Sequence, residues 1–294
     1  MPVLEINQLT KTYRSITAVK DLSLQVNKGQ VFGILGPNGS GKTTTLGIIL
    51  GIIRADAGTF SWFDGEYGRD ERMHIGALLE TPNFYPYLSA WDNLEIVAHI
   101  KKIQEPQIDR WLQLVNLLER KDSAFRTFSF GMKQRLAIAA AMIGDPAVLI
   151  FDEPTNGLDP QGIAEVREII LRIAGEGKTI IMASHILDEV EKVCSHVGII
   201  KKGKLLATGE VGAILSNDRQ VDIAAEDLPK LKALLSSLPA ITKLEEKNHH
   251  LSLLVKEEIT AAYLNKLAFD NGLVLTHLSM RSKSLESEFL EITR

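Results

Sequence analysis

The 294-residue sequence contains a single cysteine, Cys194, so no intrachain disulfide can form. A chain that folds without disulfides suits a reducing cytosol. We expect Cys194, which follows the apolar, helix-like residues 186–193, to pack in the interior. Hydrophobic residues make up 45% and charged residues 24% of the chain, as in soluble globular proteins. A chain of this length can bury a large core and form two domains.

Long apolar runs and long basic runs are also missing. The longest apolar stretches, such as residues 137–143, fall far short of the roughly 20 residues that span a bilayer. Residues 1–5 lack the basic-then-apolar pattern of a signal peptide. We therefore expect any transport driven by this chain to use a separate membrane polypeptide. The net charge of −4 and the lack of a basic run do not favour nucleic acid as a partner.

The most informative motif is Gly-Pro-Asn-Gly-Ser-Gly-Lys-Thr at residues 36–43, which fits the phosphate-binding pattern G-x-x-x-x-G-K-[ST]. A strand-like stretch precedes it and a helix-compatible stretch follows, as the motif requires. Glycines let backbone N–H groups converge on a polyphosphate, and the helix points its positive end at the same anion. We expect Lys42 to reach the β- and γ-phosphates and the Thr43 hydroxyl to ligate Mg²⁺. The predicted nucleotide contacts in this loop are Gly36, Pro37, Asn38, Gly39, Ser40, Gly41, Lys42, Thr43 and Thr44.

A second motif is the apolar run of residues 147–151, which ends in Asp152 and Glu153. Such a run suits a buried parallel strand, and ligands bind at the carboxyl ends of these strands. Asp152 can hold Mg²⁺ through water, and Glu153 can act as the general base that polarises the attacking water. Many strands end in acids, so the motif gains its meaning from the phosphate-binding loop that precedes it.

Between these motifs, residues 128–132 read Phe-Ser-Phe-Gly-Met and are followed by Lys-Gln-Arg-Leu. This segment resembles the signature of ABC-transporter ATPases, usually Leu-Ser-Gly-Gly-Gln, and differs from it at three of five places. The resemblance implies that Ser129 and Gly131 contact the γ-phosphate of a nucleotide bound by the opposite subunit. A hydroxyl and a bare backbone at a helix N-terminus are suited to an anion. The alternative is an ordinary serine-capped helix.

Further elements of this family follow in order. Residues 156–160 resemble its D-loop and contain Asp159, and His185 resembles its switch histidine. A neutral imidazole there could hydrogen-bond the γ-phosphate and the attacking water. Tyr13 stands where the family stacks an aromatic ring on adenine, although a strand aromatic can also pack in a core. The resemblance covers residues 1 to about 217.

One position departs from the family pattern, because Glu80 stands where the family has the glutamine that ligates Mg²⁺. A carboxylate is also an oxygen ligand, so we expect metal binding to survive with one more negative charge. The Glu80 form with Phe84-Tyr-Pro after it resembles the subgroup of bacitracin-resistance and lantibiotic-immunity ATPases. The aromatic stretch of residues 84–91 is predicted to form a partner surface; the alternative is that it is part of the core.

The resemblance implies an α/β fold, the P-loop ABC ATPase fold, with an N-terminal antiparallel β-subdomain and a helical subdomain inserted at about residues 83–145. We expect this domain to cover residues 1–217. Residues 218–294 follow a βαββαβ order with a final helix, which predicts a small ferredoxin-like α+β accessory domain. The pair His249-His250 is read as a polar turn rather than a metal site.

The resemblance implies an ATP-hydrolysing subunit that powers export through a separate membrane permease. Its cofactors would be ATP and Mg²⁺. Two copies, or one copy and a homologous ATPase, would sandwich two nucleotides at the cytoplasmic face of the membrane. One alternative is an ABC-type ATPase of DNA repair or the ribosome, but the tandem domains, coiled coils and basic arms typical of those are not seen. The other is a weakly hydrolysing regulatory module, against which Glu153 and His185 argue.

Overall fold

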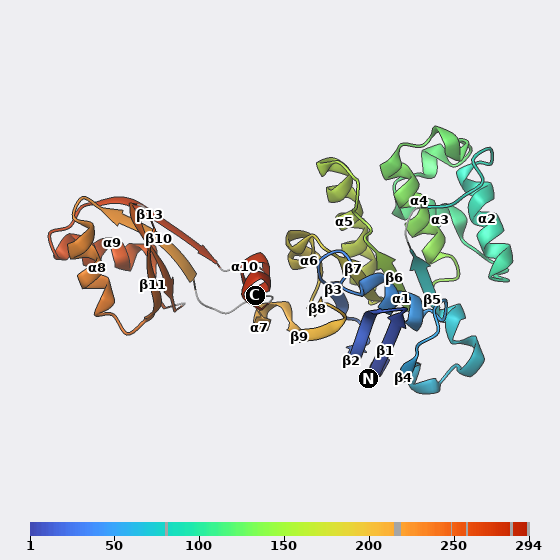
Figure 1. The fold of residues 1–294 in the computed structure, drawn as a ribbon. Coiled ribbons are helices and arrows are strands. Elements are labelled where there is room, and N and C mark those ends of the chain that lie inside the picture. The colour runs from blue at the N-terminus through green and yellow to red at the C-terminus, as the bar shows by residue number, and fades with distance from the viewer. Residues whose placement is uncertain (80–81, 215–218, 248, 257, 283–284, 293–294) are drawn as a thin grey trace. The chain divides into compact units, whose positions relative to one another are not determined.

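The computed structural model describes residues 1–79, 82–214, 219–247, 249–256, 258–282 and 285–292. The chain forms two compact units, Met1–Val211 and Gly212–Ile292, and each is described by itself (Figure 1). The expected domain boundary at residues 217 and 218 lies outside the described residues. None of the helices in the described ranges has the length and apolar character needed to cross a membrane.

The first unit is built on a six-stranded sheet of order β5-β6-β7-β3-β8-β9. Its strands are parallel except β9, which pairs antiparallel with β8. Every residue of β3, β6 and β7 is buried, as expected of parallel strands covered on both faces. The strands are β3 (Val31–Leu35), β5 (Ile75–Leu78), β6 (Val148–Asp152), β7 (Thr179–Ser184), β8 (His196–Lys201) and β9 (Lys204–Glu210).

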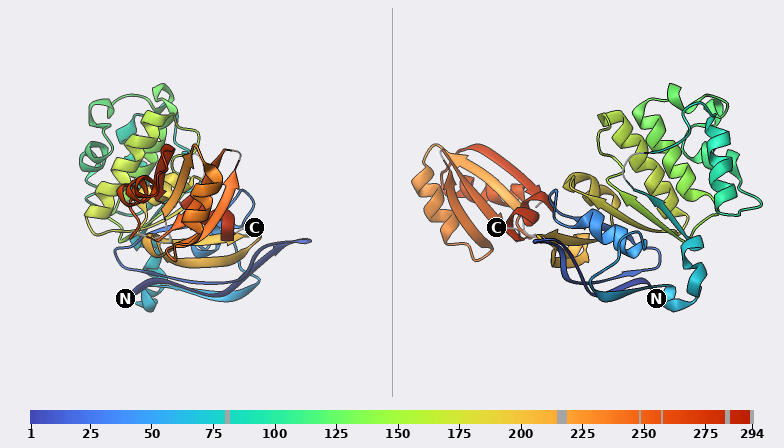
Figure 2. Two further views of the ribbon diagram at one scale, coloured as in Figure 1. Left: turned by 90° about the vertical axis from the view of Figure 1, so that its left-hand side faces the viewer. Right: turned by 45° about the vertical axis from the view of Figure 1, so that its right-hand side comes forward.

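Helices cover both faces of this sheet. Helix α1 (Lys42–Ile49) shares one core with the central strands and with a second sheet, so it lies between the two sheets (Figure 2). Helix α6 (Leu187–Val193) covers the other face, because a Cβ on Gly33 of β3 would lie 2.7 Å from Cγ1 of Val190. Helix α5 (Pro160–Gly175) packs beside α6. The predicted doubly wound arrangement is confirmed.

The second sheet is antiparallel, with order β2-β1-β4, and forms the predicted β-subdomain. Its strands are β1 (Pro2–Tyr13), β2 (Ile16–Asn27) and β4 (Ala57–Trp62). The first two strands are 12 residues long each and extend well beyond their apolar segments at residues 3–6 and 22–26. Their polar outer halves lack an apolar alternation, but they pair with each other up to Tyr13 and Ile16 at the hairpin tip.

Three helices, α2 (Ala90–Ile100), α3 (Ile108–Leu114) and α4 (Phe130–Met142), pack together as the predicted helical region (Figure 1). A capping box between Ser89 and Asp92 starts α2. Helix α3 ends at Leu114, shortly before Asn116, which adopts a left-handed φ of +56°. Short 3-10 turns complete this unit: η1 (Phe63–Gly65), η2 (Gly68–His74), η3 (Leu118–Arg120) and η4 (Phe125–Thr127).

The short helix α7 (Val211–Ile214) follows β9, and the second unit then has the predicted βαββαβ order. Its antiparallel sheet has the order β11-β12-β10-β13, the split arrangement of ferredoxin-like domains. Both helices between its strands share one apolar core with the sheet. The elements are β10 (Arg219–Ala225), α8 (Leu228–Ser236), β11 (Ile241–Lys247), β12 (His250–Val255), α9 (Ala261–Asp270), β13 (Leu275–Ser282) and α10 (Leu285–Ile292).

Candidate functional site

The phosphate-binding loop joins β3 to α1, as predicted. Two of its glycines leave no room for a side chain: a Cβ at Gly36 would collide with the carbonyl oxygen of Ile200, and one at Gly41 with that of Ala18. Gly41 also has a φ of +109°, which glycine tolerates and other residues avoid. The first N–H groups of a helix have no intrahelical acceptor, so the loop can present those of α1 to an anion.

The rest of the loop forms a rim around this helix end. Pro37, Asn38 and Gly39 are exposed, whereas Ser40 is buried beneath them. In the first turn of α1, Thr43 is exposed and Thr44 is partly buried. The rim therefore leaves the start of α1 accessible from solvent.

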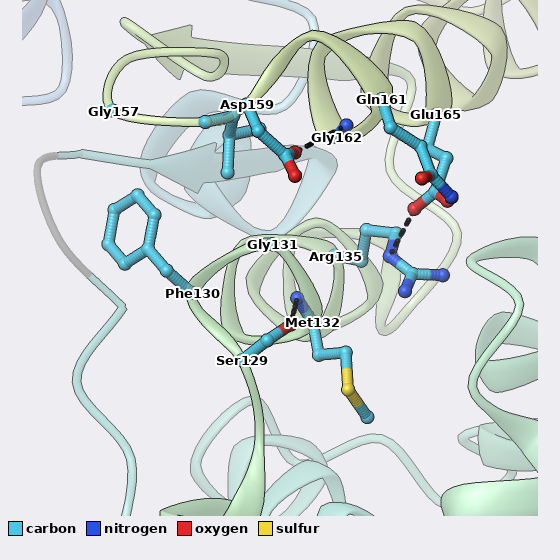
Figure 3. Close-up of a pocket in the computed structure, with 11 residues that line it drawn as sticks. Ser129, Phe130, Gly131, Met132, Arg135, Gly157, Asp159, Gln161, Gly162 and Glu165 are labelled. Carbon is cyan, nitrogen blue, oxygen red and sulfur yellow. Dashed lines mark hydrogen bonds and ion pairs between the residues drawn. The ribbon is translucent and has the colours of Figure 1, made fainter.

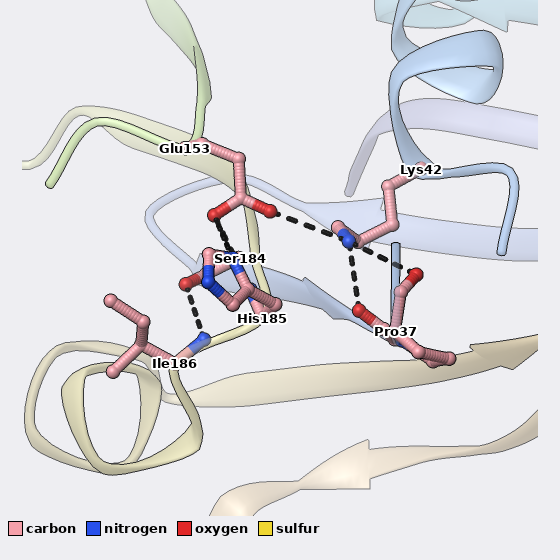
Figure 4. A network of polar contacts seen from close by, with 7 residues as sticks. Pro37, Lys42, Glu153, Ser184, His185 and Ile186 are labelled. Atoms are coloured by element: carbon pink, nitrogen blue, oxygen red, sulfur yellow. Dashed lines mark hydrogen bonds and ion pairs between the residues drawn. The ribbon is translucent and has the colours of Figure 1, made fainter. Parts of the chain in front are cut away.

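Lys42 lies at the centre of a polar network that joins three strand ends (Figure 4). Its ammonium donates to the carbonyl oxygens of Gly36 at 2.8 Å and Pro37 at 3.4 Å, and its Nζ lies 3.3 Å from Oε1 of Glu153. The other carboxylate oxygen of Glu153 lies 2.8 Å from Nδ1 of His185. A carboxylate only accepts hydrogen bonds, so this contact places a proton on Nδ1 of His185. The structure thus brings together the three residues predicted to be catalytic.

Glu153 has a left-handed backbone conformation, with a φ of +50°. Non-glycine residues in this region are strained, and such strain often occurs at functional sites. The strained residue is fixed by the hydrogen bond from its N–H to the carbonyl oxygen of Ala183, at 2.9 Å. Its carboxylate also accepts from the backbone N–H of His185 at 3.3 Å. The side chain therefore has a defined direction.

The residues predicted to hold Mg²⁺ come from two packed elements. Asp152 is the buried last residue of β6, and Thr43 lies in the first turn of α1, which contacts β6. A carboxylate and a hydroxyl suit Mg²⁺, which usually takes few protein ligands together with water and substrate phosphates. Over the described ranges, no group of three or more His, Cys, Asp or Glu side chains could hold a metal ion. Glu80, the third predicted ligand, lies outside the described residues.

Ser129, Gly131 and Asp159 line a different cavity of about 480 Å³, drawn in Figure 3. The cavity lies between two helix starts: Oγ of Ser129 caps α4 by accepting from the N–H of Met132 at 3.2 Å, and Oδ1 of Asp159 caps α5 by accepting from that of Gly162 at 2.8 Å. Its described lining contains no residue of the phosphate-binding loop. The phosphate-binding loop and this cavity are therefore two separate sites on one chain.

Comparison with known proteins decides the family. The family model described as ABC transporter matches residues 19–156. The chain is 36% identical to the bacitracin transport ATP-binding protein BcrA of Bacillus licheniformis, over 99% of this chain and 97% of that protein. The chain belongs to the family of ABC transporter ATP-binding proteins. It is also 40% identical to the lantibiotic transport ATP-binding protein SrtF of Streptococcus pyogenes, over 71% of this chain and 91% of that protein.

The fold of this ABC ATPase agrees with solved structures. It matches a structure titled as the ATP-binding subunit of an ABC transporter with a TM-score of 0.68 and 24% identity, over 99% of this chain and all of that chain. As a member of the family, the chain is an ATPase that uses ATP and Mg²⁺. ABC ATP-binding subunits work with membrane permeases and form dimeric cassettes, so the predicted partner classes are confirmed.

Tyr13 of this ABC ATPase lies at the β1–β2 hairpin tip and is 45% exposed. The ammonium of Lys11 lies 5.4 Å from the centre of its ring, and Lys11 also pairs with Asp56 at 2.9 Å. The hydrogen bond from Lys11 and, to a smaller extent, that from the N–H of Thr12 lower the pKa of the exposed Asp56 carboxyl. The ring is not packed in the core, so stacking on adenine remains a prediction for Tyr13.

Sequence reasoning missed the residue that orders the predicted partner surface. The buried side chain of Asn93 accepts from the N–H of Tyr85 at 2.8 Å and donates to the carbonyl oxygens of Tyr85 at 3.1 Å and Ser89 at 2.8 Å. Tyr85 and Tyr87 are 61% and 78% exposed, and Trp91 is partly buried. A polar residue on the inward face of α2 was the only sequence signal for this role.

Proposed function

We propose that this chain is the ATP-hydrolysing subunit of an exporter that moves peptide antibiotics, of the bacitracin or lantibiotic kind, through a separate permease. The observation that supports this substrate class most strongly is the similarity to the bacitracin transport ATP-binding protein over nearly the whole of both chains. We place the chain at the cytoplasmic face of the membrane, because ATP is supplied there.

The network around Lys42 supports a division of roles in hydrolysis. Lys42 neutralises charge on the β- and γ-phosphates, and Thr43 and Asp152 hold Mg²⁺. Glu153 accepts a proton from the attacking water as general base. The Nδ1–H of His185 holds the Glu153 carboxylate, which leaves the other ring nitrogen of a neutral His185 free to accept a hydrogen bond from the attacking water.

The phosphate-binding loop and the cavity lined by Ser129 and Gly131 are each one half-site for nucleotide in this proposal, and their separation supports a two-copy arrangement. Lys42 and Glu153 lie together at the phosphate-binding loop, whereas Ser129 and Gly131 line another cavity of the same chain. A second copy, or a homologous ATPase, would bring its Ser129 and Gly131 to the open side of the γ-phosphate. ATP then closes the pair, and hydrolysis reopens it.

The aromatic stretch supports a site for the permease. Tyr85 and Tyr87 are exposed on a loop that Asn93 holds in place, and Arg126 lies over the ring of Tyr87 at 5.6 Å. Exposed apolar rings on an ordered loop suit a short amphipathic helix of a membrane partner. Motion of the closing pair would pass to the permease through this loop.

The export function is tested by resistance. The chain is expressed with its permease in a bacitracin-sensitive host that lacks both, and growth inhibition by bacitracin and by a lantibiotic is measured. We expect resistance with the native chain and none with Glu153→Gln, which keeps the side-chain shape but cannot act as a base. Equal sensitivity with both chains, for both peptides, would contradict peptide export.

A further inference from the structure

Phe130 is the first residue of α4, between the two signature residues Ser129 and Gly131, and it is 43% exposed. Its ring points across the cavity of Figure 3 to the turn at Gly157. A Cβ placed on Gly157 would lie 3.3 Å from Cε1 of this ring and 3.8 Å from Cζ. The ring edge therefore rests directly beside the backbone of the turn.

The turn at Gly157 is tied to Glu153 by a short hydrogen-bonded loop. The N–H of Asn156 donates to the carbonyl oxygen of Glu153 at 3.1 Å, and that of Leu158 to the carbonyl oxygen of Thr155 at 3.3 Å. Gly157 has a φ of +76° at the apex. A displacement of this apex would move the backbone that carries the Glu153 carboxylate.

Two further contacts hold the start of α4 against the same loop and its helix. A Cβ on Gly131 would lie 3.7 Å from Cδ2 of Leu158, an ordinary van der Waals distance. One turn further along α4, Nε of Arg135 lies 3.5 Å from Oε2 of Glu165 in α5. The backbone positions of α4 and α5 are thus coupled, and the Phe130 ring is the contact nearest the Gly157 apex.

We propose that Phe130 is a positioning residue for ATP hydrolysis: its ring sets the place of the Gly157 turn and, through the loop, the place of the Glu153 carboxylate. This inference rests on the proposed role of Glu153 as general base. The ring acts on the site formed by the phosphate-binding loop and Glu153 of its own chain. Its neighbours Ser129 and Gly131 would contact the nucleotide bound by the opposite copy. It thereby couples the two half-sites of one chain.

The test is steady-state hydrolysis of Mg-ATP by the full chain carrying Phe130→Ala or Phe130→Leu. Small misplacements of a reacting group cost large factors in rate, so we expect kcat to fall about tenfold with alanine while KM stays within about twofold. Leucine, which restores an apolar side chain against the turn, should recover most of kcat. Phe269→Ala is the matched control, because that ring is 77% exposed in the second unit.

A double-variant cycle tests the contact itself. Gly157→Ala adds a methyl group 3.3 Å from the ring and also strains the left-handed backbone. Phe130→Ala removes only the first of these effects. We therefore expect Gly157→Ala to lower kcat by a smaller factor in the Phe130→Ala background than in the native chain.

The outcomes separate this inference from the proposed function. If the native chain hydrolyses ATP and Phe130→Ala has the native kcat, the positioning role is wrong while the ATPase stands. A rise in KM with unchanged kcat would show that the ring touches nucleotide instead, and independent effects of the two substitutions would also overturn the role. If the native chain has no hydrolysis, both the general-base assignment and this inference fail.

Discussion

Replacing Glu153 by glutamine separates nucleotide binding from turnover, because the residue contacts both Lys42 and His185. General-base catalysis contributes about 10²- to 10⁴-fold to a rate, so kcat should fall by at least about a hundredfold. The same substitution should strengthen the binding of ATP. The Lys42 ammonium lies 3.3 Å from the Glu153 carboxylate, so a phosphate that binds Lys42 must compete with that carboxylate.

The size of the binding effect follows from this contact. Glutamine can still accept a hydrogen bond from the charged ammonium, but the attraction between two opposite charges is lost, and such a partly exposed ion pair contributes up to about 1 kcal/mol. That contribution corresponds to ATP binding up to about fivefold tighter than in the native chain. The hydrogen bonds from Lys42 to the carbonyl oxygens of Gly36, at 2.8 Å, and Pro37, at 3.4 Å, remain, so the loop keeps its shape.

Calorimetric titration with Mg-ATP and phosphate release measure the two effects on the same preparations. Glu168→Gln is the matched control, since it removes an exposed glutamate that pairs with Arg172 on α5. Hydrolysis at the native rate by Glu153→Gln would remove this residue from the general-base role. ATP binding tenfold weaker than native would refute the competition between Glu153 and phosphate for Lys42.

Three further predictions follow from named contacts. Lys42→Ala removes charge-assisted hydrogen bonds to phosphate and should weaken ATP binding about 10- to 100-fold in calorimetry, and unchanged affinity would show that the loop does not hold phosphate as argued. Tyr87→Asp should abolish co-purification with the permease while basal ATPase activity is kept. Ile100→Asp, at another exposed apolar residue, should leave both co-purification and ATPase activity unchanged. Native complex formation by Tyr87→Asp would rule out the docking loop. Burial raises the pKa of the Cys194 thiol to about 12, so at pH 8 iodoacetamide should label it only after unfolding in urea, and rapid labelling of the folded chain would contradict its burial.

Local patterns made much of the fold predictable. The apolar runs of β3, β6 and β7 are continuous because both faces of these strands are buried, and Gly36 and Gly41 mark a loop that has no room for a side chain at these two positions. The βαββαβ order of the second unit was equally readable from alternating apolar segments. In each case the signal lies within one element and its flanking turns.

Contacts between distant segments were not predictable in the same way. The ion pair of Lys42 with Glu153 and the contact of Phe130 with Gly157 depend on how separate elements pack, which one sequence does not encode in a local pattern. The polar outer half of the β1–β2 hairpin cannot be read from apolar alternation, because pairing between its two strands stabilises it. The role of Asn93 depends on a loop that folds back on α2.

The central claim is that two copies of this chain complete each other's nucleotide sites through Ser129. The most direct measurement is the mass of the Glu153→Gln chain by light scattering, with Mg-ATP and with Mg-ADP. We predict a doubled mass with ATP only, kept when Ser129→Asn is added and lost when Ser129→Asp is added, since both retain a helix cap but only aspartate repels phosphate. A single-copy mass with ATP, or a dimer that tolerates Ser129→Asp, would contradict the account.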